Sequence, residues 1–318
     1  MGGELGSLVA SLLEDEPWVE RVVGLDVDPP RRRLRRAEFH RIAPTERSRI
    51  ANLVADVDPH VVVHLGVYEP NARAAAHESA AWNGPSALNV VGAAAECPSL
   101  RSIVVRSGIE VYGRGKGALT RPTETAPLAP TSAFGRQLAE IERIVGEVAQ
   151  LRQVPAAFLR LGPVLGPHVP SPLGRLLRLP LVPFDVMADA PFAVIDDRDA
   201  AAAIVAASFL EHDGALNLVA PGATTARHAA GRGDRPVLPI LRPNWTFVRP
   251  LSHLVGVPIP DHVTELLTKG RLADASLAAE VLGVKPTWTT PQVIDALFAW
   301  ESVAHYHPHE HPIPRSVA

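Results

Sequence analysis

The feature that most constrains the fold is an apolar run that ends in a turn, residues 104–113, read together with residues 130–140. The first segment, VVRSGIEVYG, has the β-branched residues of a buried strand, and its glycines permit the turn. The second segment, PTSAFGRQLAE, indicates the start of a helix. A buried strand followed by a helix is the repeating unit of an α/β protein, so this pair predicts a parallel sheet covered by helices.

The N-terminal stretch has a similar organisation. Leu5, Leu8 and Val9 follow a helical period, and Gly3 and Gly6 stand at the head of that helix. Glycines at a helix N-terminus let the backbone approach a pyrophosphate, to which the free N–H groups can donate. Two glycines alone would equally fit an ordinary helix start.

The strand that follows strengthens the prediction of a dinucleotide site. Residues 22–26 form a short apolar strand that ends in Asp26, where a nucleotide-binding unit places the carboxylate that accepts from the adenosine ribose hydroxyls. Such a carboxylate favours NAD. NADP is the alternative, because Arg31, Arg32 and Arg33 could hold a 2′-phosphate, although a solvated charged loop explains those arginines as well.

Composition excludes several other classes of protein. The net charge of -3 over 318 residues argues against a nucleic-acid-binding protein. The single cysteine, Cys97, cannot form an intrachain disulfide, and no apolar run approaches the length of a membrane span. We therefore expect a cytoplasmic protein with no nucleic-acid or membrane partner.

Further segments, taken with those above, carry a family resemblance in the same order along the chain. They are HVVVHLG with Gly66, the stretch NGPSALNVVGAAA with Asn83, the loop TETAPLAP with Glu124, the strand AAFLRLGPVLGP with Arg160 and Val164, and residues 192–199, 214–222 and 271–297. Together they resemble the extended short-chain dehydrogenases/reductases of the NAD-dependent epimerase/dehydratase family. The wording EVYG and the ending HPIPRS also resemble a divergent actinobacterial branch of UDP-glucose 4-epimerase-like proteins.

The resemblance implies a Rossmann-like, doubly wound parallel sheet whose first strand is missing or truncated in this sequence. It implies a dinucleotide-binding domain at 1–165, to which 192–220 return, a smaller substrate lobe at 166–191 and 221–297, and a His/Pro-rich tail at 298–318. The ligands would be NAD or NADP and a nucleotide-sugar-like molecule, and the protein could be a homodimer. The implied cofactor-binding residues are Gly3, Gly6, Asp26, Gly66, Asn83, Ser107, Arg160 and Val164.

The same resemblance implies that the reactive groups are absent. The family uses a serine at the end of the strand and a tyrosine and a lysine on the following helix. Those positions fall here on Gly108, Phe134 and Leu138, none of which has an ionisable group. Ser107 and Glu124 are the candidate substitutes.

Two hypotheses follow from the missing groups. The first is a family member with altered or weak catalysis. The second is a non-catalytic sensor or scaffold that binds a dinucleotide or nucleotide sugar. The histidine-dense tail could gather a metal, but its prolines favour a solvated arm or one that packs across a partner, so we predict no metal site.

Overall fold

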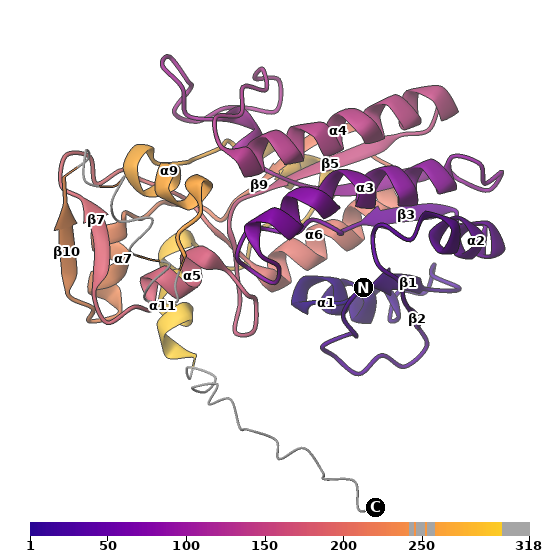
Figure 1. Ribbon diagram of the computed structural model, residues 1–318, viewed down its shortest axis with the longest axis horizontal. Helices are drawn as coiled ribbons and strands as arrows, with labels where there is room; N and C mark the ends of the chain where they lie inside the picture. The colour runs from indigo at the N-terminus through magenta and orange to yellow at the C-terminus, as the bar shows by residue number, and fades with distance from the viewer. Residues whose placement is uncertain (242–244, 246–251, 253–257, 301–318) are drawn as a thin grey trace, which may run out of the picture.

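The computed structural model describes residues 1–241, 245, 252 and 258–300. It shows helices on both faces of a parallel sheet, with further elements packed at one end (Figure 1). The helices are α1 Glu4–Leu13, α2 Arg47–Val57, α3 Ala76–Ala94, α4 Ala133–Arg152, α5 Pro172–Leu177, α6 Asp197–Leu210, α7 Ala226–Arg232, α9 Asp261–Lys269, α10 Ser276–Leu282, α11 Thr290–Ala299 and the 3₁₀ helix η1 Ile109–Tyr112. The strands are β1 Val23–Asp26, β2 Glu38–Arg41, β3 Val61–His64, β4 Ser102–Gly108, β5 Ala156–Leu161, β6 Val164–Leu165, β7 Val182–Asp185, β8 Ile195–Asp196, β9 Gly214–Leu218 and β10 Val237–Ile240.

The central sheet is parallel, with the strand order β3-β4-β5-β9. A separate parallel pair, β1-β2, lies beside it, and no strand among the described residues joins the two. The N-terminus lies beside β1 (Figure 1), and the Met1 ammonium donates to the Leu25 carbonyl at 3.0 Å. The α/β fold with a parallel sheet is confirmed.

The side chains of β4 point alternately to the two faces of the sheet, and so contribute to two apolar cores, one on each face. Ile103 and Val105 belong to the apolar cluster under α2, α3 and α4, whereas Val104 belongs to the cluster under α1 and α6. Strands covered on both faces are apolar throughout, which explains why this run is so easily recognised in the sequence. Helix α4 begins where predicted, because the Ser132 side chain accepts from the Gly135 N–H at 3.0 Å.

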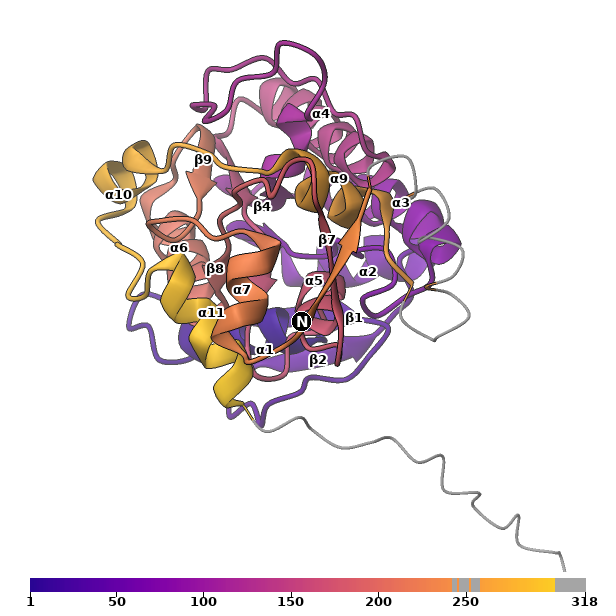
Figure 2. The same cartoon turned by 90° about the vertical axis from the view of Figure 1, so that its left-hand side faces the viewer.

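A third apolar cluster lies at the far end, where β7 and β10 pair in parallel beside α5, α7 and α11 (Figure 2). Strand β6 pairs with β8, and β9 completes the edge of the main sheet. The division of the chain into a dinucleotide-binding domain and a substrate lobe stays a prediction. The tail from residue 301 onward lies outside the described residues.

Candidate functional site

Two adjoining clefts open near the carboxyl ends of the central strands. The first, here called the glycine cleft, is lined by Gly2, Gly3, Gly6 and Arg73 among others. The second, here called the inner cleft, contains the positions where the family carries its reactive groups. The residues that line both clefts are Val67, Glu69, Arg106 and Val164. Ligands of doubly wound sheets bind at this edge.

The glycine cleft is built around the start of α1. Gly3 caps that helix with a φ of 74°, a conformation that residues with a side chain rarely adopt. A Cβ on Gly3 would lie 2.4 Å from the Arg73 guanidinium, and one on Gly6 would lie 3.1 Å from the Met1 backbone. A side chain at either of the two glycines predicted from the sequence would therefore crowd its neighbours.

Asp26 ends β1 beside those glycines and is held by Arg73. The guanidinium lies 3.1 Å from an Asp26 oxygen and 2.6 Å from Asp28. Burial opposes the charge of Arg73, but the two carboxylates outweigh it and raise its pKa. Arg73 and the N-terminus of α1 line the glycine cleft, and the Asp26 carboxylate is bonded to Arg73 without lining the cleft itself. Together these groups form a donor and acceptor set suited to a ribose and a pyrophosphate.

The three family catalytic positions lie together in the inner cleft, but packing atoms fill their surroundings. Phe134 is 5% exposed and Leu138 is 1% exposed, both on the buried side of α4. A Cβ on Gly108 would lie 2.4 Å from a carboxylate oxygen of Glu110 and 3.0 Å from Leu138. The neighbouring side chains have therefore closed over the space that a serine would need.

A histidine–carboxylate pair faces this region, and sequence reasoning missed it. His262 of α9 lies 3.0 Å from Glu69 through its Nε2, and its ring packs on Phe134 with centroids 4.9 Å apart. Burial lowers the pKa of His262, but Asp261 and Glu69 outweigh it and raise that pKa to about 9. Sequence spacing could not have joined these residues, because α9 and the loop after β3 are distant in the chain.

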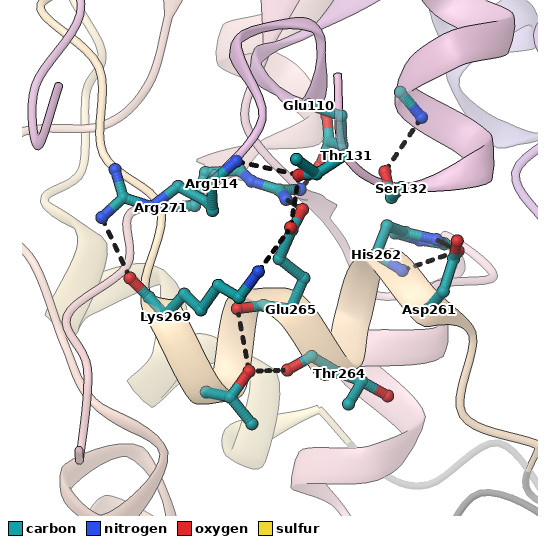
Figure 3. A network of polar contacts seen from close by, with 12 residues as sticks. Glu110, Arg114, Thr131, Ser132, Asp261, His262, Thr264, Glu265, Lys269 and Arg271 are labelled. Atoms are coloured by element: carbon teal, nitrogen blue, oxygen red, sulfur yellow. Dashed lines mark hydrogen bonds and ion pairs between the residues drawn. The ribbon is translucent and has the colours of Figure 1, made fainter. Parts of the chain in front are cut away.

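Glu110 is held by a second buried network, shown in Figure 3. Arg271 donates to Glu110 at 2.8 Å and to Glu265 at 2.6 Å, and Lys269 lies 3.4 Å from Glu265. Thr131 also donates to Glu265. This network ties η1 and the start of α4 to α9, and so fixes the helix that carries His262.

Three of the predicted site residues are engaged within the protein. The Ser107 hydroxyl donates to Glu142 at 2.5 Å, and Arg160 donates to the same carboxylate at 2.8 Å and to Tyr112 at 2.8 Å. The Glu124 side chain accepts from the backbone of Asn217 at 2.8 Å. Ser107 lines the inner cleft, while neither cleft is lined by Arg160 or Glu124. Their roles toward a cofactor or substrate stay predictions.

The remaining predicted residues shape the loop between the two clefts. The Asn83 side chain bonds the N–H and carbonyl of Tyr68, and it donates to Gln137 at 2.6 Å. A Cβ on Gly66 would lie 2.5 Å from the Ser86 hydroxyl, so α3 passes close to that loop.

Two absences concern the described residues only. No group of three or more histidine, cysteine, aspartate or glutamate side chains among them could hold a metal ion. No helix in that part of the chain is long and apolar enough to cross a membrane. The histidine-dense tail lies almost wholly in residues 301–318 and is outside both statements.

Several known proteins are similar to this chain in sequence or in architecture. An uncharacterized protein of Mycobacterium tuberculosis (strain ATCC 25618 / H37Rv) is 29% identical over 310 residues, which cover 92% of this chain and 80% of that protein. A crystal structure of UDP-galactose 4-epimerase has a TM-score of 0.69 at 20% identity, covering 93% of this chain and 95% of its own. The structure of UDP-glucuronic acid 4-epimerase from Bacillus cereus, in complex with NAD, has a TM-score of 0.71 at 17% identity, and the match covers 94% of this chain and 95% of that one.

The family model matches the part of the chain that builds the glycine cleft and the family catalytic positions. That model describes the NAD dependent epimerase/dehydratase family, and it matches residues 1–179, which is more than half of the 318 residues. The parallel sheet, the glycines at the head of α1 and the carboxylate ending β1 agree with it. The chain therefore belongs to the NAD dependent epimerase/dehydratase family.

Proposed function

We propose that this protein binds a dinucleotide in the glycine cleft, with NAD preferred over NADP, and a nucleotide-sugar-like molecule in the inner cleft. Its catalysis would be altered or weak. The observation that carries the proposal is the meeting of Gly3 and Arg73 in the glycine cleft, with Asp26 bonded to Arg73. Similar structures bound to NAD and to nucleotide sugars support the choice of ligands.

The glycine cleft fits such a cofactor by its chemistry. The Asp26 carboxylate would accept from the ribose hydroxyls, and the free N–H groups of α1 would donate to the pyrophosphate. Arg73 would exchange its bond to Asp26 for the pyrophosphate charge. The bound nicotinamide would supply hydride transfer.

The inner cleft accounts for the proposed weakness of catalysis. Gly108, Phe134 and Leu138 offer neither a proton nor a charge. General acid–base assistance alone contributes about 10²–10⁴ in rate, so its loss removes most turnover by the family's usual route.

A second function, a non-catalytic sensor or scaffold, is favoured by one observation. The space beside Gly108 is occupied by one oxygen of the Glu110 carboxylate, whose other oxygen is ion-paired to Arg271. The reactive positions are therefore incorporated into the packed interior as well as substituted. A protein that only binds its ligands requires nothing more of this region.

Calorimetric titration with NADH and NADPH tests the binding proposal, and we expect micromolar to millimolar affinity with NADH preferred. Gly3→Ala should weaken the affinity for NADH about tenfold or more, because the new methyl group would clash with Arg73 in the glycine cleft. Gly117→Ala is the matched control, since Gly117 has a similar φ of 81° but open space around it. Flat heats at millimolar NADH would contradict the proposal.

Turnover measurements test the proposed loss of the family's usual catalytic route. We expect no detectable epimerisation of UDP-galactose, whereas ordinary turnover of ~1–10³ s⁻¹ would show that another group replaces the missing ones. A homodimeric state and a cytoplasmic location belong to the same proposal. Sedimentation equilibrium and cell fractionation would test them.

A further inference from the structure

Arg106 lies where the glycine cleft and the inner cleft meet, and it lines both of them. It is the third-to-last residue of β4, and side chains alternate along a strand. Arg106 therefore shares a face with Val104, which packs in the cluster under α1 and α6. That face leads toward the start of α1, where a ligand's anionic groups are expected.

Within the described residues, Arg106 has no ion pair. Its one hydrogen bond there is a long one, from Nη1 to the Val67 carbonyl at 3.4 Å. A guanidinium carries five N–H donors in a fixed fork, so most of its capacity is unused. This situation is unusual for an arginine enclosed between a sheet and a helix layer.

The nearest carboxylates are already committed to other cations. Glu69 is bound to His262 at 3.0 Å, and Glu110 is bound to Arg271 at 2.8 Å. They act on Arg106 only at longer range, and Arg73 adds a second positive charge on the other side. The neighbouring carboxylates are thus paired with other cations, and among the described residues Arg106 itself forms no ion pair.

Arg106 is half-buried, and a partly desolvated cation with no close opposite charge is costly, because the lost hydration is not repaid. The pKa of Arg106 is correspondingly lowered by its burial. An anion in the cleft would remove this cost, and a carboxylate or phosphate matches the guanidinium fork with two parallel hydrogen bonds.

We propose that Arg106 is the binding group for an anionic oxygen cluster of the ligand, a carboxylate or a phosphate, at the junction of the two clefts. The inference rests on the proposed function only in that the clefts take ligands. The anion has three possible sources: a carboxylate on the sugar of a nucleotide sugar, the diphosphate of that nucleotide sugar, or the pyrophosphate of the dinucleotide. The second source would weaken the binding of both nucleotide sugars equally in the variant.

The test compares the native protein with Arg106→Met, which keeps the length of the side chain and removes its charge. Arg114→Met is the matched control: Arg114 also bonds only carbonyl oxygens, at 2.7 and 3.1 Å, and it lines neither cleft. Calorimetry would use NADH, UDP-glucose and UDP-glucuronic acid. The two nucleotide sugars differ only at C6 of the sugar, which is a hydroxymethyl carbon in UDP-glucose and a carboxylate carbon in UDP-glucuronic acid.

We expect Arg106→Met to lose about tenfold or more in affinity for the ligand that carries the anion. If the source is the sugar, the native preference for UDP-glucuronic acid over UDP-glucose disappears in the variant, and NADH binding is unchanged. If the source is the dinucleotide, NADH binding weakens and the sugar preference is the same in both proteins. The inference is overturned if no affinity falls further in Arg106→Met than in Arg114→Met.

Thermal unfolding without ligand supplies a second readout. Removing a half-buried charge that has no ion pair among the described residues should leave the melting temperature of Arg106→Met equal to or above that of the native protein, whereas a purely structural arginine would lower it. If the native protein binds neither NADH nor a nucleotide sugar, the proposed function fails, and inorganic phosphate then decides the inference. Phosphate should raise the melting temperature of the native and Arg114→Met proteins but not of Arg106→Met, and equal shifts in all three would overturn it.

Discussion

Replacing His262 by glutamine should remove a pH-dependent part of the protein's stability. His262 is almost fully buried between Glu69 and Asp261, with Phe134 stacked on its ring. Burial opposes its charge, yet those two carboxylates, with a further contribution from Glu110, favour the protonated ring. The folded chain therefore binds the proton of His262 more tightly than the unfolded chain does.

The structure sets the size of this effect. The pKa of His262 rises from 6.5 to about 9, and each pKa unit corresponds to about 1.4 kcal/mol, so protonation contributes about 3 kcal/mol to folding. Because the folded-state pKa is the higher one, the contribution is complete below pH 6.5. It is lost as the pH rises through 9.

Urea unfolding of the native and His262→Gln proteins at several pH values between 6 and 10 measures the difference directly. Ionisations common to both proteins cancel in that difference. We expect the native protein's advantage to be largest near pH 6 and to shrink by about 3 kcal/mol toward pH 10.

His64→Gln is the control with the opposite sign. His64 is fully buried, its Nε2 has no hydrogen-bond partner among the described residues, and burial lowers its pKa to about 4. Its contribution changes only below pH 6.5, so this variant should show no such trend between pH 6.5 and 10. A His262→Gln difference that is constant with pH, or that grows as the pH rises, would refute the assigned charge pair.

Three further substitutions probe the packing around the inner cleft by urea unfolding at pH 7.5. Gly108→Ser should lower the free energy of unfolding by about 1–3 kcal/mol, because its Cβ would lie 2.4 Å from a carboxylate oxygen of the buried Glu110. An unchanged midpoint of urea unfolding would contradict this crowding. Glu142→Ala should lose about 3–5 kcal/mol, since it leaves Arg160 buried without its carboxylate, and a loss under about 1 kcal/mol would show that the pair is not needed. Leu138→Lys should lose about 3–5 kcal/mol, whereas Leu151→Lys, at a position 79% exposed, should be near neutral; similar losses would refute the burial of Leu138.

Local sequence patterns determined much of the fold. The apolar run of β4, the glycines before α1 and the carboxylate ending β1 were all predicted correctly from short segments. Each depends on backbone preference or on burial of neighbouring residues, which nearby sequence controls. The order of these segments was enough to indicate the family, which the family model then confirmed.

Local sequence could not show how side chains are used once the segments pack. Ser107 and Arg160 belong to recognisable motifs, yet both side chains are bound to Glu142 on α4. A motif specifies where a residue lies along its strand. It does not specify which helix side chain will meet it.

By itself, the sequence determined the parallel α/β architecture and the loss of reactive groups at Gly108, Phe134 and Leu138. Tertiary structure alone decided what replaced them. Packing of α9 against α4 brings His262 onto Phe134 and beside Glu69, and the pairing of the neighbouring carboxylates leaves Arg106 without an ion pair among the described residues. These outcomes depend on contacts between segments far apart in the chain, where burial makes each unpaired charge costly and so gives the cleft its chemistry.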